Sequence, residues 1–416
     1  MDGDCAAAVD EKHVQSPAAG EAPGSLLSTP LVLVMAVACG AAAANLYYAQ
    51  PLLDTLAGAF GVGTGTAGLI VTMTQLGYAL GLLFVVPLGD ILDRRRLIVA
   101  VILCTVGALT VAALASDMKI FLAASLAVGV TSVVAMILVP FAASLAEDRR
   151  RGRVVGQIMS GLLMGILLAR TVSGVLADAL GWRSVFWFAA GLMLVQCAVL
   201  WRMLPHMRST ARLSYPALLR SVLPLIKEEP VLRRRIAYGA LMFATFSALW
   251  TCLPFLLAHP PYGYDDTVIG AFGLAGAAGA LCASVAGRMA DRGWTRVQTG
   301  VFIGLVLAAF YLMDVKNDSL AAIIAGVVLL DLGVQGTQIT NQSEIYKLRP
   351  DARSRITTAY MTCFFIGGAL GSSISAYLFS FYGWHGVCLL CMGMAIAAAS
   401  FWLTEWRSSE TAAGIK

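Results

Sequence analysis

One carboxylate in this sequence lies deep inside a long apolar segment. Asp331 is about 12 residues, roughly 18 Å of helix, from the start of the segment 320–343. In a bilayer, an ionised carboxylate at such a depth costs at least ~2.5–3.5 kcal/mol, so it should face a cavity or a partner. A carboxyl group held there can take up and release a proton. We therefore expect Asp331 to be a proton-coupling residue.

Three glutamines continue the polar face of this segment. Gln335, Gln338 and Gln342 follow Asp331 at +4, +7 and +11, which keeps the four side chains within an arc of roughly 60° on one helix face. This stripe predicts the lining of a substrate cavity, and a structural hydrogen-bond network between helices is the alternative. Polar and aromatic residues of two other segments are further expected substrate contacts: Asn45, Tyr48 and Trp250.

Arg170 is the only basic residue that we place inside an apolar segment. Three interpretations are open: it pairs with Asp331, binds an anionic substrate, or extends outward as a structural anchor. Tyr47 is expected to be an aromatic residue of the membrane interface. No residues are spaced as metal ligands or as a catalytic pair, and we interpret the CxxC of Cys388 and Cys391 as structural. Neither a metal, a cofactor nor an enzyme activity is therefore expected.

The elements that would hold these residues are membrane helices. The chain of 416 residues is 59% hydrophobic and 13% charged, whereas a soluble chain carries about 25% charged residues. Its apolar runs are continuous over about 20 residues, the length of a helix that crosses a bilayer. The twelve predicted spans lie at 30–52, 67–88, 96–115, 120–145, 154–177, 184–204, 236–257, 267–288, 296–313, 320–343, 356–379 and 385–404.

The basic residues predict an orientation. With the N-terminus in the cytoplasm, 25 of the 29 Lys and Arg residues lie on the cytoplasmic side and three on the other side. Both termini are therefore expected in the cytoplasm, and the chain in a bacterial inner membrane. The expected organisation is a disordered cytosolic tail at 1–29, a six-helix half at 30–204, a cytosolic linker at 205–235, a second six-helix half at 236–404 and a cytosolic tail at 405–416.

The two halves repeat one another. Asp90 and Asp291 end the second and eighth spans at an offset of 201, and Gly181-Trp182 and Gly383-Trp384 follow the fifth and eleventh spans at an offset of 202. Many secondary transporters build a central site between two such repeats. The sequence thus predicts an all-α integral membrane protein of twelve transmembrane helices in two six-helix repeats.

Two loops carry a related motif. Residues 87–96 read PLGDILDRRR and residues 287–292 read GRMADR. Both resemble the loop G-x-L-A-D-R-x-G-R-[RK] of the major facilitator superfamily. A carboxylate flanked by arginines at the cytosolic end of a helix can pair across the interface between the halves. The residues expected to form such cytosolic latches are Asp90, Arg94, Arg95, Asp291 and Arg292.

Three further segments, NLYYAQP at 45–51, TQLGYALG at 74–81 and DLGVQG at 331–336, are similar to those of bacterial twelve-span drug:proton antiporters and related exporters. This resemblance implies a secondary active transporter that works by alternating access and exports a small organic compound or drug in exchange for protons. The expected partners are the lipid bilayer, a small organic substrate and protons, with no nucleic acid and no ATP, and the chain is expected to be a monomer. Two alternatives remain: an importer or exchanger of a small organic anion that uses Arg170, and a membrane sensor that does not transport.

Overall fold

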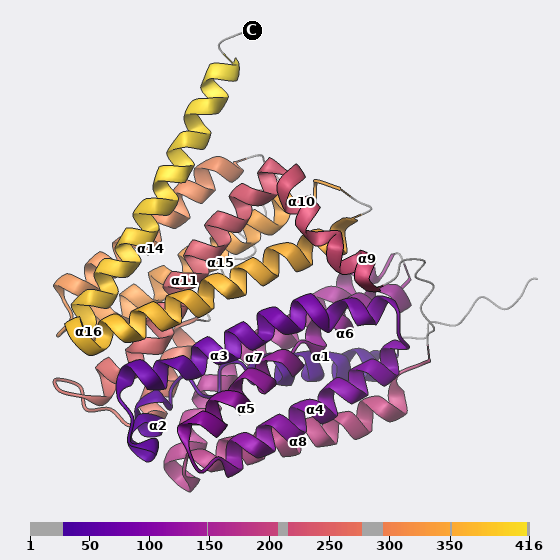
Figure 1. Cartoon of the computed structure of the whole chain (residues 1–416), viewed down its shortest axis with the longest axis horizontal. Helices are drawn as coiled ribbons and strands as arrows, with labels where there is room; N and C mark the ends of the chain where they lie inside the picture. The colour runs from indigo at the N-terminus through magenta and orange to yellow at the C-terminus, as the bar shows by residue number, and fades with distance from the viewer. Residues whose placement is uncertain (1–27, 148, 207–214, 277–293, 350–351, 414–416) are drawn as a thin grey trace, which may run out of the picture.

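The computed structural model describes residues 28–147, 149–206, 215–276, 294–349 and 352–413, with side chains of the last helix described as far as Glu405. These parts of the chain contain helices and no strand (Figure 1). The helices of the first half are α1 Thr29–Ala44, α2 Leu53–Phe60, α3 Thr64–Phe84, η1 Val86–Asp90, α4 Arg94–Leu114, α5 Met118–Thr131, α6 Val134–Leu145, α7 Arg151–Leu180 and α8 Trp182–Met203. Those that follow are α9 Tyr215–Arg220, α10 Val222–Glu228, α11 Pro230–Ala258, α12 Asp266–Ala271, η2 Phe272–Gly276, α14 Thr295–Val315, α15 Leu320–Ile345 and α16 Arg353–Ala413.

The helices occupy the positions of the twelve predicted spans. Nine helical stretches of the described chain are long and apolar enough to cross a membrane, and the two shorter apolar ones are Thr29–Ala44 and Asp266–Gly276. α16 accounts for two spans because its backbone leaves the helical conformation at Gly383. The span predicted at 267–288 is described only as far as Gly276. The all-α fold is therefore confirmed.

The start of α11 differs from the prediction. α11 begins at Pro230, six residues before the predicted span at 236–257. Proline is favourable in the first turn of a helix, because its missing N–H has no partner there in any case. The early start places Arg235 inside the helix rather than in a loop, and its side chain is only 3% exposed.

The Gly-Trp pairs that relate the two halves make equivalent turns. Gly181 has a φ of 83° and Gly383 a φ of 61°, a region that costs a residue with a Cβ but not glycine. Both tryptophans that follow are buried, and the Trp384 Nε1–H donates to the Met313 carbonyl at 3.1 Å. Glycine thus permits the reversal of the chain, and tryptophan fixes the next helix against its own half.

Glycines also bring α1 against α7. A Cβ on Gly161 would lie 2.5 Å from the Ala36 carbonyl oxygen, and a Cβ on Gly165 would meet the backbone of Gly40. Such contacts between small residues allow membrane helices to approach closely. The packing holds the end of α1, which carries Asn45, beside the middle of α7.

We call the end of the bundle with Arg94, Arg153 and the segment between the halves the basic end, and the opposite end, with Asp54, Asp178 and Asp266, the acidic end. α3 and α16 lie side by side (Figure 1), and they are the helices through which the halves pack most extensively. In this interface Ser372 of α16 bonds to Thr72 at 3.3 Å and to Thr251 at 2.9 Å.

The halves also meet at the acidic end itself. The Thr55 hydroxyl donates to Asp266 at 2.7 Å, and the Thr267 N–H donates to Asp178 at 2.7 Å. A Cβ on Gly174 of α7 would collide with the backbone of Asp266. Since backbone meets backbone there, the two halves are tightly closed at the acidic end.

Candidate functional site

Arg170 lies in an aromatic cage between the two halves. Its side chain projects from α7 and is 3% exposed. The guanidinium carbon lies 3.8 Å from the ring centroid of Trp250, 4.9 Å from that of Tyr47 and 5.7 Å from that of Phe246. Its Nε–H donates to the Gln50 Oε1 at 2.9 Å. Aromatic faces attract a cation more strongly when water is excluded, so this cage stabilises a buried positive charge.

Asp331 is the negative counterpart of this site. Its side chain projects from α15 and is 3% exposed, and its Oδ1 has no hydrogen-bond partner within the protein. It interacts electrostatically with Arg170, but no N–O distance within 4.0 Å joins the two as an ion pair. A Cβ on Gly276 would lie 2.7 Å from Oδ2. Asp331 and Arg170 are therefore neighbours without direct contact.

Several other polar atoms of the site lack a protein partner. They are the Arg170 Nη2, the Gln50 Nε2 and both side-chain polar atoms of Asn45. Buried polar groups are normally hydrogen-bonded, so these atoms make the region a candidate binding site. The Gln50 amide is oriented by Arg170, which leaves its N–H group free to donate. A narrow crevice adjoins the site, with walls from Arg170, Trp250 and Ile269.

The structure brings several of the predicted cavity residues together. Arg170, Trp250 and Asp331 meet at one place, and the turn after α1 reaches the same place through Tyr47 and Gln50. Tyr47 is 7% exposed, so its expected position at the membrane interface was wrong. Sequence reasoning also missed Gln50, although the NLYYAQP segment that carries it was the signal.

Tyr48 and Asn45 lie in the same turn as Tyr47. Tyr48 is buried, and its carbonyl accepts a hydrogen bond from the Ser173 hydroxyl of α7 at 2.5 Å. Asn45 is 6% exposed and ends α1. This hydrogen bond ties the turn to α7, and neither polar atom of the Asn45 amide has a partner within the protein.

The glutamine stripe continues from Asp331 towards the basic end. Gln335, Gln338 and Gln342 are all half-buried on α15. The Gln338 Oε1 accepts a hydrogen bond from the Tyr360 hydroxyl at 2.6 Å, and its Nε2 lies 3.5 Å from the Met361 Sδ. Gln338 therefore takes part in a network between helices, and its role in substrate binding stays a prediction, as it does for the other two.

The arginines after the second span bind within the first half. Arg94 pairs with Asp90 at 3.7 Å and donates to the Ser144 hydroxyl at 3.3 Å. Arg95 donates to the Trp201 carbonyl and stacks on the indole ring at 4.7 Å. Asp291 and Arg292, the other two latch residues, lie outside the described residues. Pairing across the halves thus stays a prediction.

Asp93, in the same loop, caps α4. Its carboxylate accepts a hydrogen bond from the Arg96 N–H at 3.0 Å and lies 3.3 Å from the His206 ring nitrogen. Slight burial raises the pKa of Asp93, but these hydrogen bonds and the nearby charges outweigh that effect and lower the pKa below its ordinary value. The loop is therefore held to the start of α4 by an ionised cap.

A second buried charge pair was not expected from the sequence. Arg235 of α11 lies 3.9 Å from Glu405 at the end of α16, with side-chain exposures of 4% and 11%. Arg235 also donates to the Thr299 hydroxyl at 3.1 Å, and the Tyr238 hydroxyl donates to Glu405 at 2.9 Å. The sequence places Arg235 in the predicted cytosolic linker and Glu405 in the predicted cytosolic tail. Residues at the ends of apolar runs give no sign that their side chains are buried.

Metal-binding groups do not gather in the described parts of the chain, where no three His, Cys, Asp or Glu side chains lie together. Cys388 and Cys391 are buried free thiols of α16. The chemistry of the site therefore rests on Arg170, Asp331 and the polar groups around them.

A site of opposite charges between two helical repeats is typical of a membrane carrier. Comparison with known proteins identifies the family of carriers. The sequence profile of the Major Facilitator Superfamily matches residues 33–372. The chain belongs to the Major Facilitator Superfamily. This confirms the resemblance carried by the two loop motifs, and it means that the protein is a membrane transporter of this superfamily. Membership also implies transport rather than enzymatic catalysis.

Relatives agree with this assignment. The chain is 50% identical over 390 residues to the "Uncharacterized transporter YgaY" of Escherichia coli O157:H7, covering 94% of this chain and 99% of that protein. It is 33% identical over 386 residues to the "Probable transporter SCO4007" of Streptomyces coelicolor, covering 92% and 87%. Among solved structures, a bacterial homologue of the human lysosomal transporter Spinster, in an inward-facing and occupied conformation, superposes with a TM-score of 0.73 at 13% identity, covering 91% of this chain and 96% of that one. That likeness supports the fold.

Proposed function

We propose that this transporter exports a small organic compound from a bacterial cytoplasm in exchange for protons. The observation that carries the proposal is Asp331, a carboxylate that is 3% exposed, has one oxygen without a partner, and lies beside a buried cation. The basic end would face the cytoplasm, as the distribution of Lys and Arg indicates, so both termini would lie there too.

In this mechanism Asp331 binds the proton and Arg170 responds to it. When Asp331 is ionised, its charge attracts the Arg170 guanidinium across a medium of low dielectric constant. When Asp331 binds a proton, that attraction ends, and the guanidinium is held by Gln50 and the aromatic cage alone. In the proposed exchange the substrate is held while Asp331 is ionised, and proton binding to Asp331 releases it, so that protons and substrate move in opposite directions.

Alternating access requires the site to open to each side in turn. Closure at the acidic end supports a conformation in which the substrate reaches the site from the basic end. Opening of the other side would then break the hydrogen bonds from Thr55 to Asp266 and from Thr72 to Ser372, which join the two halves. In the proposed mechanism, the loops with Asp90, Arg94 and their counterparts in the second half close the basic end at that stage.

The test uses everted membrane vesicles that are acidified inside by respiration, with a pH-sensitive dye. A panel of drugs and metabolites is added, and a substrate is recognised because it collapses the proton gradient. We expect Asp331→Asn to abolish this collapse and Asp318→Asn, which changes an exposed carboxylate at the acidic end, to leave it intact. Full, pH-dependent activity in Asp331→Asn would exclude Asp331 as the proton-coupling residue.

A second candidate function is supported by the hydrogen-bond donors of the site. Three of the unpartnered atoms, in Asn45, Gln50 and Arg170, belong to N–H groups, and such groups recognise an anion. An importer or exchanger of a small organic anion would take up labelled carboxylates into intact cells, and Arg170→Ala would remove this uptake. Membership in a transporter family favours either form of transport over the sensor that does not transport.

A further inference from the structure

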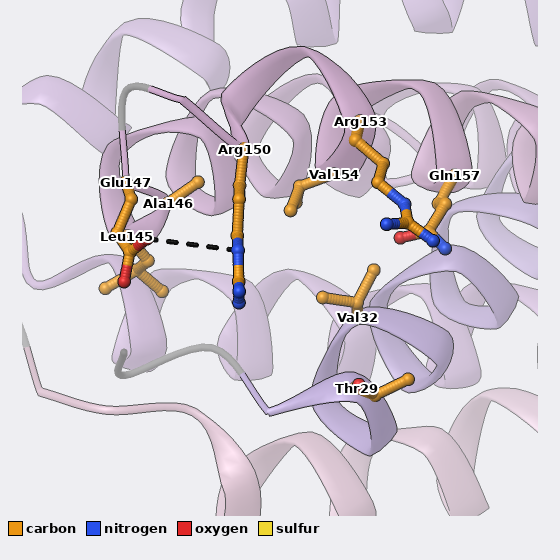
Figure 2. A pocket seen from close by; sticks show the side chains of 9 residues that line it. All are labelled: Thr29, Val32, Leu145, Ala146, Glu147, Arg150, Arg153, Val154 and Gln157. Carbon is orange, nitrogen blue, oxygen red and sulfur yellow. Dashed lines mark ion pairs between the residues drawn. The ribbon is translucent and has the colours of Figure 1, made fainter. Parts of the chain in front are cut away.

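A second cavity lies at the basic end of the first half, far along the chain from Asp331. Its volume is about 270 Å³, and it is enclosed by α1, the end of α6 and the start of α7. Val32, Leu145 and Val154 are buried and form its apolar floor. Arg150, Arg153 and other polar residues are exposed and form its rim (Figure 2).

The polar rim carries a net positive charge. Figure 2 shows the Arg150 side chain extending into the cavity and the Arg153 guanidinium beside Gln157. Among the described residues that line the rim there is one carboxylate: Glu147 lies 3.9 Å from the Arg150 Nε. Their side chains are 58% and 71% exposed, and exposed pairs of this kind contribute only about 0–1 kcal/mol. An anion can therefore displace Glu147 from Arg150.

Partial charges of the backbone add to the positive electrostatic potential of the cavity. α1 begins at Thr29 and α7 begins at Arg151, so the amino ends of both helices lie at the cavity. The side chain of Arg150, which precedes the first residue of α7, makes no capping hydrogen bond. The amino end of a helix carries a partial positive charge, which favours a nearby anion. Two guanidinium groups and two helix ends thus surround one space.

We propose that this cavity binds a phosphate-bearing anion, through Arg150 and Arg153. A guanidinium fork matches two phosphate oxygens, and charge-assisted hydrogen bonds of this type are stronger than neutral ones. Gln157 and the Thr29 hydroxyl can donate to the remaining oxygens. The apolar floor suits the carbon part of the molecule. Basic pockets between membrane helices bind the headgroups of anionic lipids, and a soluble phosphate offers the same oxygen atoms.

The test measures binding to the purified full-length protein. Native mass spectrometry in detergent titrates phosphatidylglycerol, with phosphatidylcholine as the uncharged comparison, and a second series asks whether inorganic phosphate competes. The double variant Arg150→Gln/Arg153→Gln removes the two guanidinium groups of the cavity. The control Arg149→Gln/Arg202→Gln makes the same change of charge at exposed positions of the basic end that do not line the cavity.

We expect phosphatidylglycerol to bind about tenfold more weakly to the cavity variant, and the control variant to bind as the wild type does. In a second outcome, binding of inorganic phosphate depends on the cavity arginines while lipid binding does not depend on them. That result would identify a soluble phosphate as the ligand and would support the proposed site. Equal losses in the cavity and control variants would show a general effect of charge and overturn the proposal. Failure of both probes to bind the wild type would also overturn it.

Discussion

Cysteines introduced at Gly65 and Ser380 should join the two halves at the acidic end. A Cβ on Gly65 of α3 lies 3.9 Å from the Ser380 Cβ of α16 and 3.7 Å from its Oγ. Disulfides connect Cβ atoms that are about 3.5–4.5 Å apart. The variant Gly65→Cys/Ser380→Cys should therefore form a disulfide on mild oxidation without distorting either helix. Ser380 is exposed and Gly65 is half-buried, so an oxidant can reach them.

The cross-link tests whether the acidic end must open during transport. Peptide mass spectrometry identifies the cross-linked pair, and the dye assay in vesicles measures transport of any substrate that the panel reveals. We expect oxidation to reduce transport to background and dithiothreitol to restore it. The matched control is Gly65→Cys/Ser373→Cys, because Ser373 lies seven residues, roughly 10 Å, before Ser380 on α16 and so away from Gly65.

Two results would refute this reasoning. Absence of the disulfide in protein that is folded and oxidised would mean that α3 and α16 do not meet as the structure places them. A complete disulfide with undiminished transport would mean that the acidic end does not open between Gly65 and Ser380.

Three further predictions concern stability, each measured as the midpoint of thermal unfolding in detergent. Arg235→Met and Glu405→Gln should each lower the free energy of unfolding by about 3–5 kcal/mol, because each removes one member of a buried ion pair, whereas the double variant should recover most of the loss. Gly165→Leu should lower the free energy of unfolding by about 1–3 kcal/mol, because it forces α1 away from α7. Gly156→Leu, at an open position of the same helix, should leave the free energy of unfolding unchanged. Asp93→Ala should cost about 1 kcal/mol at neutral pH through loss of the α4 cap. Because the pKa of Asp93 is lowered in the folded state, its contribution is present above the ordinary carboxyl pKa and is lost as the pH falls through the lowered value, so wild type and variant should converge in acid.

The fold could be predicted because the bilayer limits the choice of structure. Hydrogen bonds of the backbone must be satisfied within each span, so a run of about 20 apolar residues has one solution, a helix. The repeated Gly-Trp turn was visible in the sequence for a similar reason, since only glycine enters the positive φ region without cost. The length of α11 was less visible, because Arg233, Arg234 and Arg235 interrupt its apolar pattern.

The site could be predicted only in part. Asp331 and Arg170 were evident because a charge inside an apolar span is costly and rare. The aromatic cage was not evident, because an aromatic residue near a span end is compatible with both the interface and the interior. Burial of Tyr47 depends on the closeness of α1 and α7, which the glycines permit but do not specify.

The proposed proton site and the closure of the acidic end share one structural segment. The stretch of α12 and η2 contacts both charged residues: a Cβ on Gly273 would lie 2.9 Å from the Arg170 side chain, and one on Gly276 would lie 2.7 Å from the Asp331 carboxylate. The same stretch packs against α7 where the halves close. A ligand shifts a conformational equilibrium only by interacting differently with its two states. In the proposed mechanism a proton on Asp331 does so, because it changes the force between Asp331 and Arg170, which both contact the segment that must move when the acidic end opens.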